Sequence, residues 1–192
     1  YNVMDGMDGF AAGMAIIGFG GLAALGYFAG EFVFTAAALV VSAVALGFLV
    51  FNFPPARIFM GDTGSALLGL LVAGFVLFAQ KRGIAPLWVG ILLFSPFVVD
   101  ATVTLVRRTL KGEAFWQAHR QHYYQRAVQL GWGHRNTVLF EYGLMAGCAV
   151  SAVAAVGLPI SGQRVIIIGW VAVYIALAAM VAMIEGKRGI SG

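Results

Sequence analysis

The sequence predicts an all-α membrane protein, a polytopic bundle of about six transmembrane helices. Of its 192 residues, 61% are hydrophobic and only 10% are charged, and the mean hydropathy is +0.91. A soluble chain carries about 25% charged residues, so this chain lacks the polar groups that a water-facing surface needs. Its apolar runs are continuous, whereas an outer-membrane barrel has short alternating segments. We therefore expect residues 1–192 to form one membrane domain.

Each expected span is an apolar run close to the roughly 20 residues that cross a bilayer as a helix. Six runs meet this description: Phe10–Gly30, Phe32–Phe51, Gly64–Gln80, Pro86–Val106, Val138–Gly157 and Val165–Ile184. Glycines in the first run, such as Gly13, Gly18 and Gly20, suit close helix packing. The single cysteine, Cys148, lies inside the fifth run and is expected to be a small packing residue.

Basic residues gather on one side of the expected bundle. That side holds the long polar connections 52–63 and 107–137, both chain ends, and nine of the 12 lysines and arginines. The positive-inside rule places it in the cytoplasm, with the spans in the inner membrane. The net charge of +4 is thereby explained by topology, and we expect no nucleic-acid partner.

The first polar motif is "NVMDGMDG", from Asn2 to Gly9. Asp5 and Asp8 are three residues apart, so in a helical turn they would share one face. One interpretation is a helix N-terminus with acidic residues in its first turn. The other is a site for a hard cation or a polar substrate, which paired carboxylates before a span would suit.

The second motif, "NFPPARIFMGDTGS", lies between the second and third spans. Asp62 could cap a helix that begins near Gly64. A helix N-terminus also attracts phosphate, which a carboxylate repels unless a divalent cation lies between them. Asp62 with Mg²⁺ and a diphosphate is therefore the alternative to simple capping.

The third motif is the basic loop that contains "AHRQHYYQR". His119 and His122 could exchange protons near phosphate, and Arg120 could bind its oxygens. The alternative is an interfacial amphipathic helix whose aromatic belt includes Tyr123 and Tyr124. A zinc site is disfavoured because no third ligand has suitable spacing.

Two further carboxylates, Asp100 and Glu141, fall within expected spans. An intramembrane carboxylate suggests function by default. Both lie near the expected cytoplasmic ends of their spans, where each could pair with an arginine, so a structural role is the first interpretation.

In this order and spacing, the three motifs resemble those of the polyprenyl-phosphate N-acetylhexosaminyl-1-phosphate transferases. This superfamily contains phospho-MurNAc-pentapeptide translocase and the undecaprenyl-phosphate GlcNAc-1-phosphate transferase. The resemblance covers essentially the whole chain, as the C-terminal half of such an enzyme. It implies that a UDP-activated N-acetyl sugar 1-phosphate is transferred to a polyprenyl phosphate with release of UMP. The product would initiate a lipid-linked cell-envelope glycan such as O-antigen.

The resemblance also implies cofactors and partners. Mg²⁺ is the expected cofactor, with Mn²⁺ as an alternative. The expected partners are the UDP-N-acetyl sugar, the polyprenyl phosphate and the lipid bilayer, and a homodimer is left open. By motif position, the implied catalytic residues are Asp5, Asp8, Asp62, His119 and His122, with Asp62 as the metal ligand. The implied substrate-binding residues are Asn2, Asn52, Phe59 and Arg120, with Phe59 placed to stack on uracil.

Two departures from the family pattern matter. The expected Asp-Asp pair is absent, and the chain starts at Tyr1, so we expect that pair upstream and the fragment alone to be inactive. The loop has His-Arg-x-His in place of consecutive histidines, which favours a GlcNAc or N-acetyl-deoxyhexose donor. The alternatives are a phospho-MurNAc-pentapeptide transferase, a membrane scaffold, or a transporter, which would need a polar midplane and broken helices in both halves.

Overall fold

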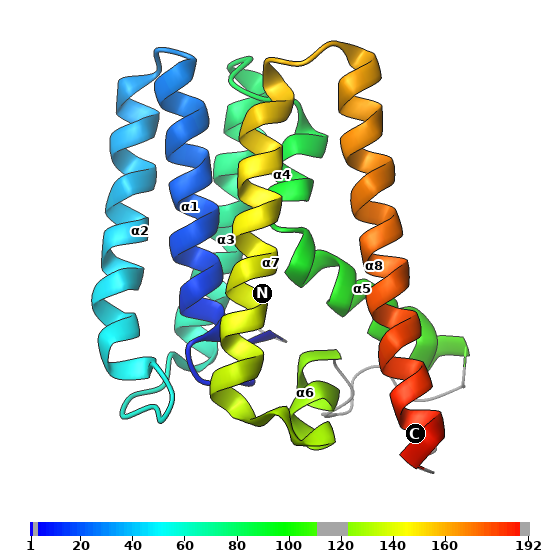
Figure 1. Ribbon diagram of the computed structural model, residues 1–192. Helices are drawn as coiled ribbons and strands as arrows, with labels where there is room; N and C mark the ends of the chain where they lie inside the picture. The colour runs from blue at the N-terminus through cyan, green and yellow to red at the C-terminus, as the bar shows by residue number, and fades with distance from the viewer. Residues whose placement is uncertain (2–3, 111–122, 189–192) are drawn as a thin grey trace.

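The computed structural model is a bundle of helices that stand side by side (Figure 1). It describes residues 1, 4–110 and 123–188, and no strand occurs among them. The helices are α1 (Phe10–Phe28), α2 (Phe32–Asn52), α3 (Gly61–Lys81), α4 (Leu87–Leu93), α5 (Ser95–Leu110), α6 (Tyr123–Ala127), α7 (Gly133–Val156) and α8 (Ile160–Arg188). A kinked turn, Val128–Trp132, joins α6 to α7, with Gly131 in the left-handed region at φ 92°. The predicted all-α class is confirmed.

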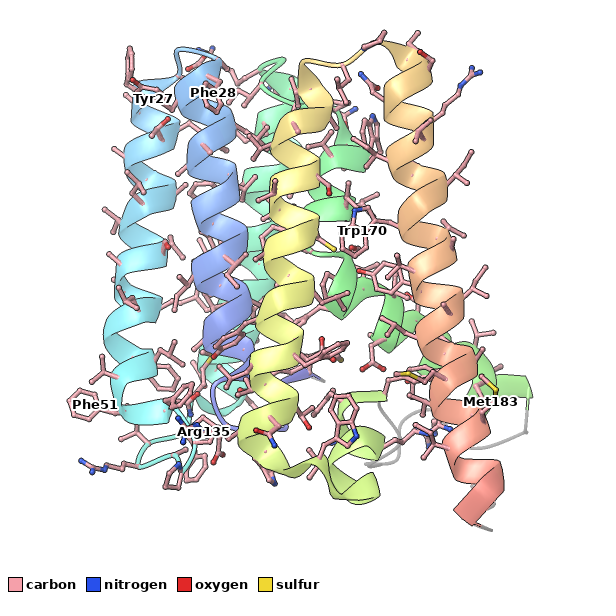
Figure 2. The ribbon with its side chains drawn as sticks, viewed as in Figure 1. Tyr27, Phe28, Phe51, Arg135, Trp170 and Met183 are labelled. Carbon is pink, nitrogen blue, oxygen red and sulfur yellow. The ribbon has the colours of Figure 1, made fainter. Side chains whose placement is uncertain are left out.

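Five helices, α1, α2, α3, α7 and α8, are long and apolar enough to cross a membrane. Exposed aromatic side chains mark both ends of the bundle (Figure 2), with Tyr27 and Phe28 at one end and Phe51 at the other. Aromatic side chains of this kind are enriched where a transmembrane helix meets the lipid headgroups. The chain is a multi-pass membrane protein.

The predicted fourth span is broken. Within it, α4 and α5 are bent by 83° relative to each other, and only as a pair would they make a sixth span. Pro96 is the second residue of α5. It lacks the N–H that would continue the α4 ladder, and its ring clashes with the carbonyl four residues earlier. The expected span over Pro86–Val106 is thus present as a bent pair of helices and not as one continuous helix.

Helix α1 is the interior helix of the bundle. In its apolar window 72% of residues are buried, against 0% for α8, which lies at the periphery. A Cβ at Gly13 would overlap the ring of Tyr142, and one at Gly18 would overlap the ring of Phe94. Glycine is thus required where these rings lie against the helix. Gly20 has nothing within 4 Å, so the packing role expected for it is wrong.

The polar segments lie at one end of the bundle (Figure 1). The connection from α2 to α3, helix α6 and the C-terminal end of α8 are at this end, and the short turns α1–α2, α3–α4 and α7–α8 are at the other. The predicted two-sided layout is confirmed. Helices α3 and α7 begin earlier than expected, at Gly61 and Gly133 in place of Gly64 and Val138.

Candidate active site

The first polar motif, which contains Asp5 and Asp8, forms a turn that leads into α1; we call it the acidic motif and its turn the acidic turn. The N-cap of α1 is Gly9, in the left-handed conformation with φ 75°; no side chain caps the helix, and its first turn holds no acidic residue. Asp5 and Asp8 precede the helix. The helix-capping interpretation of these two residues is therefore wrong, and so is the expectation that they share a helical face.

Two side chains fasten this turn to the second motif. The amide of Asn52 accepts a hydrogen bond from the Gly9 N–H at 2.9 Å and donates one to the Ile58 carbonyl at 2.8 Å. The Asp8 carboxylate accepts a hydrogen bond from the Ala56 N–H at 3.0 Å. The two motifs, far apart in sequence, thus become one structural unit.

Helix α7 supports the same turn. The Tyr142 hydroxyl donates a 2.6 Å hydrogen bond to the Gly9 carbonyl, and its ring lies against Gly13. The fifth expected span therefore does more than cross the membrane, since it fixes the turn from which Asp5 projects.

Between the two motifs lies a cavity of about 260 Å³. It is lined by Asp5, Gly6, Met7, Asp8, Asn52, Phe59, Met60, Gly61 and Asp62. Burial, and secondarily the negative charge of Asp62, raises the pKa of the Asp5 carboxyl to about 6. Two carboxylates from different motifs thus act on each other across this cavity, an arrangement that a cation would relieve.

Asp62 lies in the first turn of α3. The helix begins at Gly61, its N-cap is Met60, and no side chain caps it. The interpretation of Asp62 as a helix cap is therefore wrong. Free N–H groups at such a helix start attract phosphate oxygens.

The donors in the cavity fit Mg²⁺. This ion is commonly held by one or two carboxylates together with water and substrate phosphates, and Asp62 and Asp5 supply such a pair. Within the described part of the chain, no group of three or more His, Cys, Asp or Glu side chains could hold a metal. The pair therefore suits a cation that also binds substrate better than a closed structural site.

The remaining predicted site residues differ in their availability. Phe59 is 76% exposed at the cavity, with its ring free to meet a planar base. Asn52 is 5% exposed, and its side-chain amide is hydrogen-bonded to the backbone of Gly9 and Ile58. The other four predicted residues, Asn2, His119, Arg120 and His122, lie outside the described residues.

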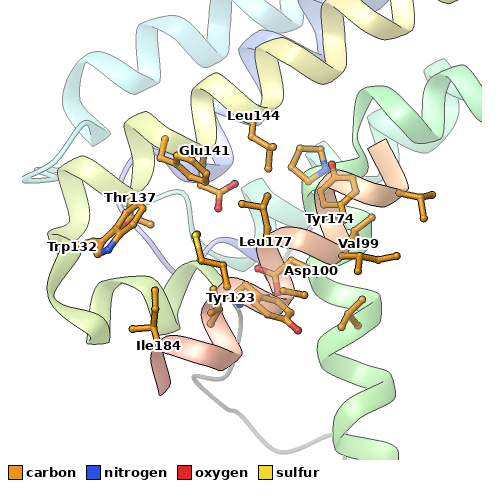
Figure 3. Close-up of a pocket in the computed structure, with 18 residues that line it drawn as sticks. Val99, Asp100, Tyr123, Trp132, Thr137, Glu141, Leu144, Tyr174, Leu177 and Ile184 are labelled. Atoms are coloured by element: carbon orange, nitrogen blue, oxygen red, sulfur yellow. Dashed lines mark hydrogen bonds between the residues drawn. The ribbon is translucent and has the colours of Figure 1, made fainter. Parts of the chain in front are cut away.

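A second cavity, of about 490 Å³, lies among α5, α7 and α8 (Figure 3). Its lining is mostly apolar, with Asp100 and Glu141 among the polar exceptions. Asp100 accepts hydrogen bonds from the Thr104 hydroxyl and the Tyr123 N–H, each at 3.0 Å. These bonds agree with a structural role for Asp100.

Sequence reasoning missed the role of Tyr124, which was placed in an aromatic belt. The residue is 1% exposed and lies against the acidic turn. Arg126, in the same helix, is only 8% exposed. The place of both residues within the third motif was the available signal.

Residues 1–80 match the family described as glycosyl transferase family 4. The chain is 33% identical to a probable undecaprenyl-phosphate N-acetylglucosaminyl 1-phosphate transferase of Bacillus subtilis, over 79% of this chain and 43% of the relative. The first 80 residues are thus similar to glycosyl transferase family 4. The family match and this relative confirm the superfamily to which the motifs pointed.

Other relatives carry different names. A phospho-N-acetylmuramoyl-pentapeptide-transferase of Chlorobium chlorochromatii is 35% identical over 76% of this chain and 44% of its own length. A decaprenyl-phosphate N-acetylglucosaminephosphotransferase of Mycobacterium tuberculosis is 31% identical over 79% of this chain and 44% of its own length. The chain thus spans somewhat under half the length of these relatives.

Proposed function

We propose that the full-length protein transfers an N-acetylhexosamine 1-phosphate from a UDP-sugar to a polyprenyl phosphate such as undecaprenyl phosphate. An oxygen of the lipid phosphate attacks the β-phosphorus of the donor and forms a new P–O bond. The bond from that phosphorus to the bridging oxygen breaks, and UMP leaves with the electron pair. The product is a lipid-linked diphosphate sugar that initiates a cell-envelope glycan.

The observation that carries this proposal is the placement of Asp5 and Asp62 on one cavity. Asp62, with Asp5, would hold Mg²⁺, which when bound neutralises charge on the reacting phosphates. The first-turn N–H groups of α3 are available to phosphate oxygens, and Phe59 is free to stack on uracil. Asn52 and Asp8 hold the two loops in register.

The same layout supports a location and a direction of access. With the site loops in the cytoplasm and the helices in the inner membrane, the UDP-sugar arrives from the cytoplasm. The polyprenyl phosphate arrives from the bilayer. Nine of the 12 lysines and arginines belong to the side with the long loops, and the positive-inside rule places that side in the cytoplasm.

The decisive experiment is a donor screen on the purified full-length protein with undecaprenyl phosphate and Mg²⁺, scored by UMP release. We expect release with UDP-GlcNAc or a UDP-N-acetyl-deoxyhexose. Turnover with UDP-MurNAc-pentapeptide alone would establish the alternative transferase. Failure with every donor would contradict the proposed reaction.

The Asp62→Asn variant tests the metal ligand. It keeps the shape of the side chain and removes the charge, so we expect UMP release to fall by roughly 100-fold or more. The amount of protein in the membrane should stay unchanged. Full activity in this variant would exclude Asp62 as the ligand.

A further inference from the structure

Helix α6 begins directly after the two histidines of the third motif, here called the histidine motif, and its second residue packs against α1. The Tyr124 side chain is 1% exposed, and its ring centroid lies 4.6 Å from that of Phe10, the first residue of α1. An aromatic side chain at a membrane interface would keep its polar end in water. Tyr124 instead directs its hydroxyl into the protein.

The hydroxyl meets the acidic turn. A Cβ placed on Gly6 would lie 2.5 Å from the Tyr124 hydroxyl oxygen and 3.1 Å from the Gln125 amide nitrogen. Two polar groups of α6 therefore stand against the backbone next to Asp5, where only glycine leaves room. Burial first, and then the charges of Asp100 and Asp5, raises the pKa of Tyr124, so the hydroxyl keeps its proton.

Helix α5 holds the start of α6. The Tyr123 N–H, which opens the helix and has no partner within it, donates to the Asp100 carboxylate at 3.0 Å. The Thr104 hydroxyl donates to the same oxygen at 3.0 Å and orients the carboxylate. Figure 3 shows Asp100 beside Tyr123 in the wall of the larger cavity. A carboxylate is favoured at a helix start, where the backbone N–H groups are positive.

We propose that Tyr124 and Asp100 are positioning residues of the transferase site. Tyr124 fixes α6 against the Asp5–Gly6 turn, and Asp100 fixes the first residue of α6 to α5. Together they set the position of the acidic turn, and so of Asp5, relative to the helix that follows the histidine motif. The effect on turnover rests on the proposed function, whereas the effect on the turn does not.

The Tyr124→Phe variant keeps the ring on Phe10 and removes only the hydroxyl, and Tyr123→Phe is the matched control one residue away. In the full-length protein we expect Tyr124→Phe to lower kcat by roughly 10- to 100-fold, because small misplacements of reacting groups are costly. The KM for polyprenyl phosphate should stay unchanged, and Tyr123→Phe should behave as wild type. Equal kcat values for the two variants would overturn the proposal.

Asp100 is tested by a conservative pair. Asp100→Asn keeps an oxygen acceptor for the Tyr123 N–H and should retain most of the activity, whereas Asp100→Ala removes the acceptor and should not. If Asp100→Asn fails like Asp100→Ala at the same unfolding temperature, the hydrogen bond does not carry the effect. If Tyr124→Phe proves unstable, the two Asp100 variants still test whether the position of α6 affects turnover.

Hydrogen exchange provides a readout that does not depend on turnover. The peptide covering residues 4–9 should exchange several-fold faster in Tyr124→Phe and Asp100→Ala than in wild type or Tyr123→Phe. Unchanged exchange in both variants would overturn the positioning role. If the wild-type protein releases no UMP from any donor, the proposed reaction fails, and the exchange rates still decide whether the two residues position the turn.

Discussion

At the scale of single residues, the acidic motif separates into two roles. Asp8 is engaged by the Ala56 N–H, so it holds the loops together. Asp5 is half-buried, and this burial, followed by the negative charge of Asp62, raises its pKa from 3.8 to about 6. Its surroundings therefore disfavour the ionised form of the side chain. A bound cation would stabilise that form, because it supplies a positive charge beside the carboxylate.

The Asp5 pKa predicts a pH-dependent requirement for Mg²⁺. Below about pH 6 the carboxyl is protonated and the cation must displace the proton; above it the carboxylate is already formed. The Mg²⁺ concentration for half-maximal UMP release should therefore fall as pH rises through this value and then level off. The variant Glu31→Gln, which removes a carboxylate at the far end of the bundle, should show the same pH dependence as the unmodified protein. A requirement that is constant on both sides of the pKa would contradict a role for Asp5.

At the scale of elements, small residues decide which helix lies inside. Helix α1 is interior because rings from α7 and from the α4–α5 break lie against its glycines. Packing at such points is sensitive to a single added methyl group, because protein interiors are close-packed. The turn carrying Asp5 is thus joined to an interior helix, which suits a site that needs a fixed geometry.

Two alanine substitutions in α1 test this packing. Gly13→Ala places a methyl group in the Tyr142 ring and should lower the free energy of unfolding by about 1–3 kcal/mol. Gly20→Ala meets nothing within 4 Å and should be neutral or slightly stabilising, since alanine favours a helix. Both are measured by thermal unfolding in the same detergent. Equal effects would show that α1 is not packed as described.

At the scale of the whole molecule, polar groups and apolar surface are separated. The site loops and α6 share one end of the bundle, where Figure 2 also shows Arg135, while large apolar side chains cover the outer helices. A protein built this way can receive a water-soluble substrate at one membrane face and a lipid from the side. The arrangement follows from the cost of exposing polar groups to hydrocarbon.

The orientation in the membrane is tested with single cysteines. Arg57→Cys and Ser161→Cys are exposed positions at opposite ends, in a background where cysteines outside this chain are replaced. A membrane-impermeant maleimide added to intact cells should label Ser161→Cys and reach Arg57→Cys only after permeabilisation. Cys148, 0% exposed, should give no background. The reverse pattern would place the site loops outside the cell.

Much of this protein was predictable because its signals are local. Apolar runs of spanning length predicted the helices, and the order of these runs along the chain predicted which polar segments share one end of the bundle. The break at Pro96 had a local signal too, although periodicity and length alone concealed it. The motif residues identified the family because their spacing within each loop is short.

Other features depend on contacts between distant segments. Sequence spacing put Asp5 and Asp8 on one face, whereas the fold directs Asp8 to Ala56 and places Asp5 near Asp62. An aromatic residue beside a basic loop suggested a membrane belt, whereas packing on Phe10 buries Tyr124. The sequence by itself determined the helices, their sidedness and the chemistry of the motifs, because these follow from local hydrophobicity and charge. Only the tertiary structure decided which carboxylates meet, because that depends on how α1, α3, α6 and α7 pack.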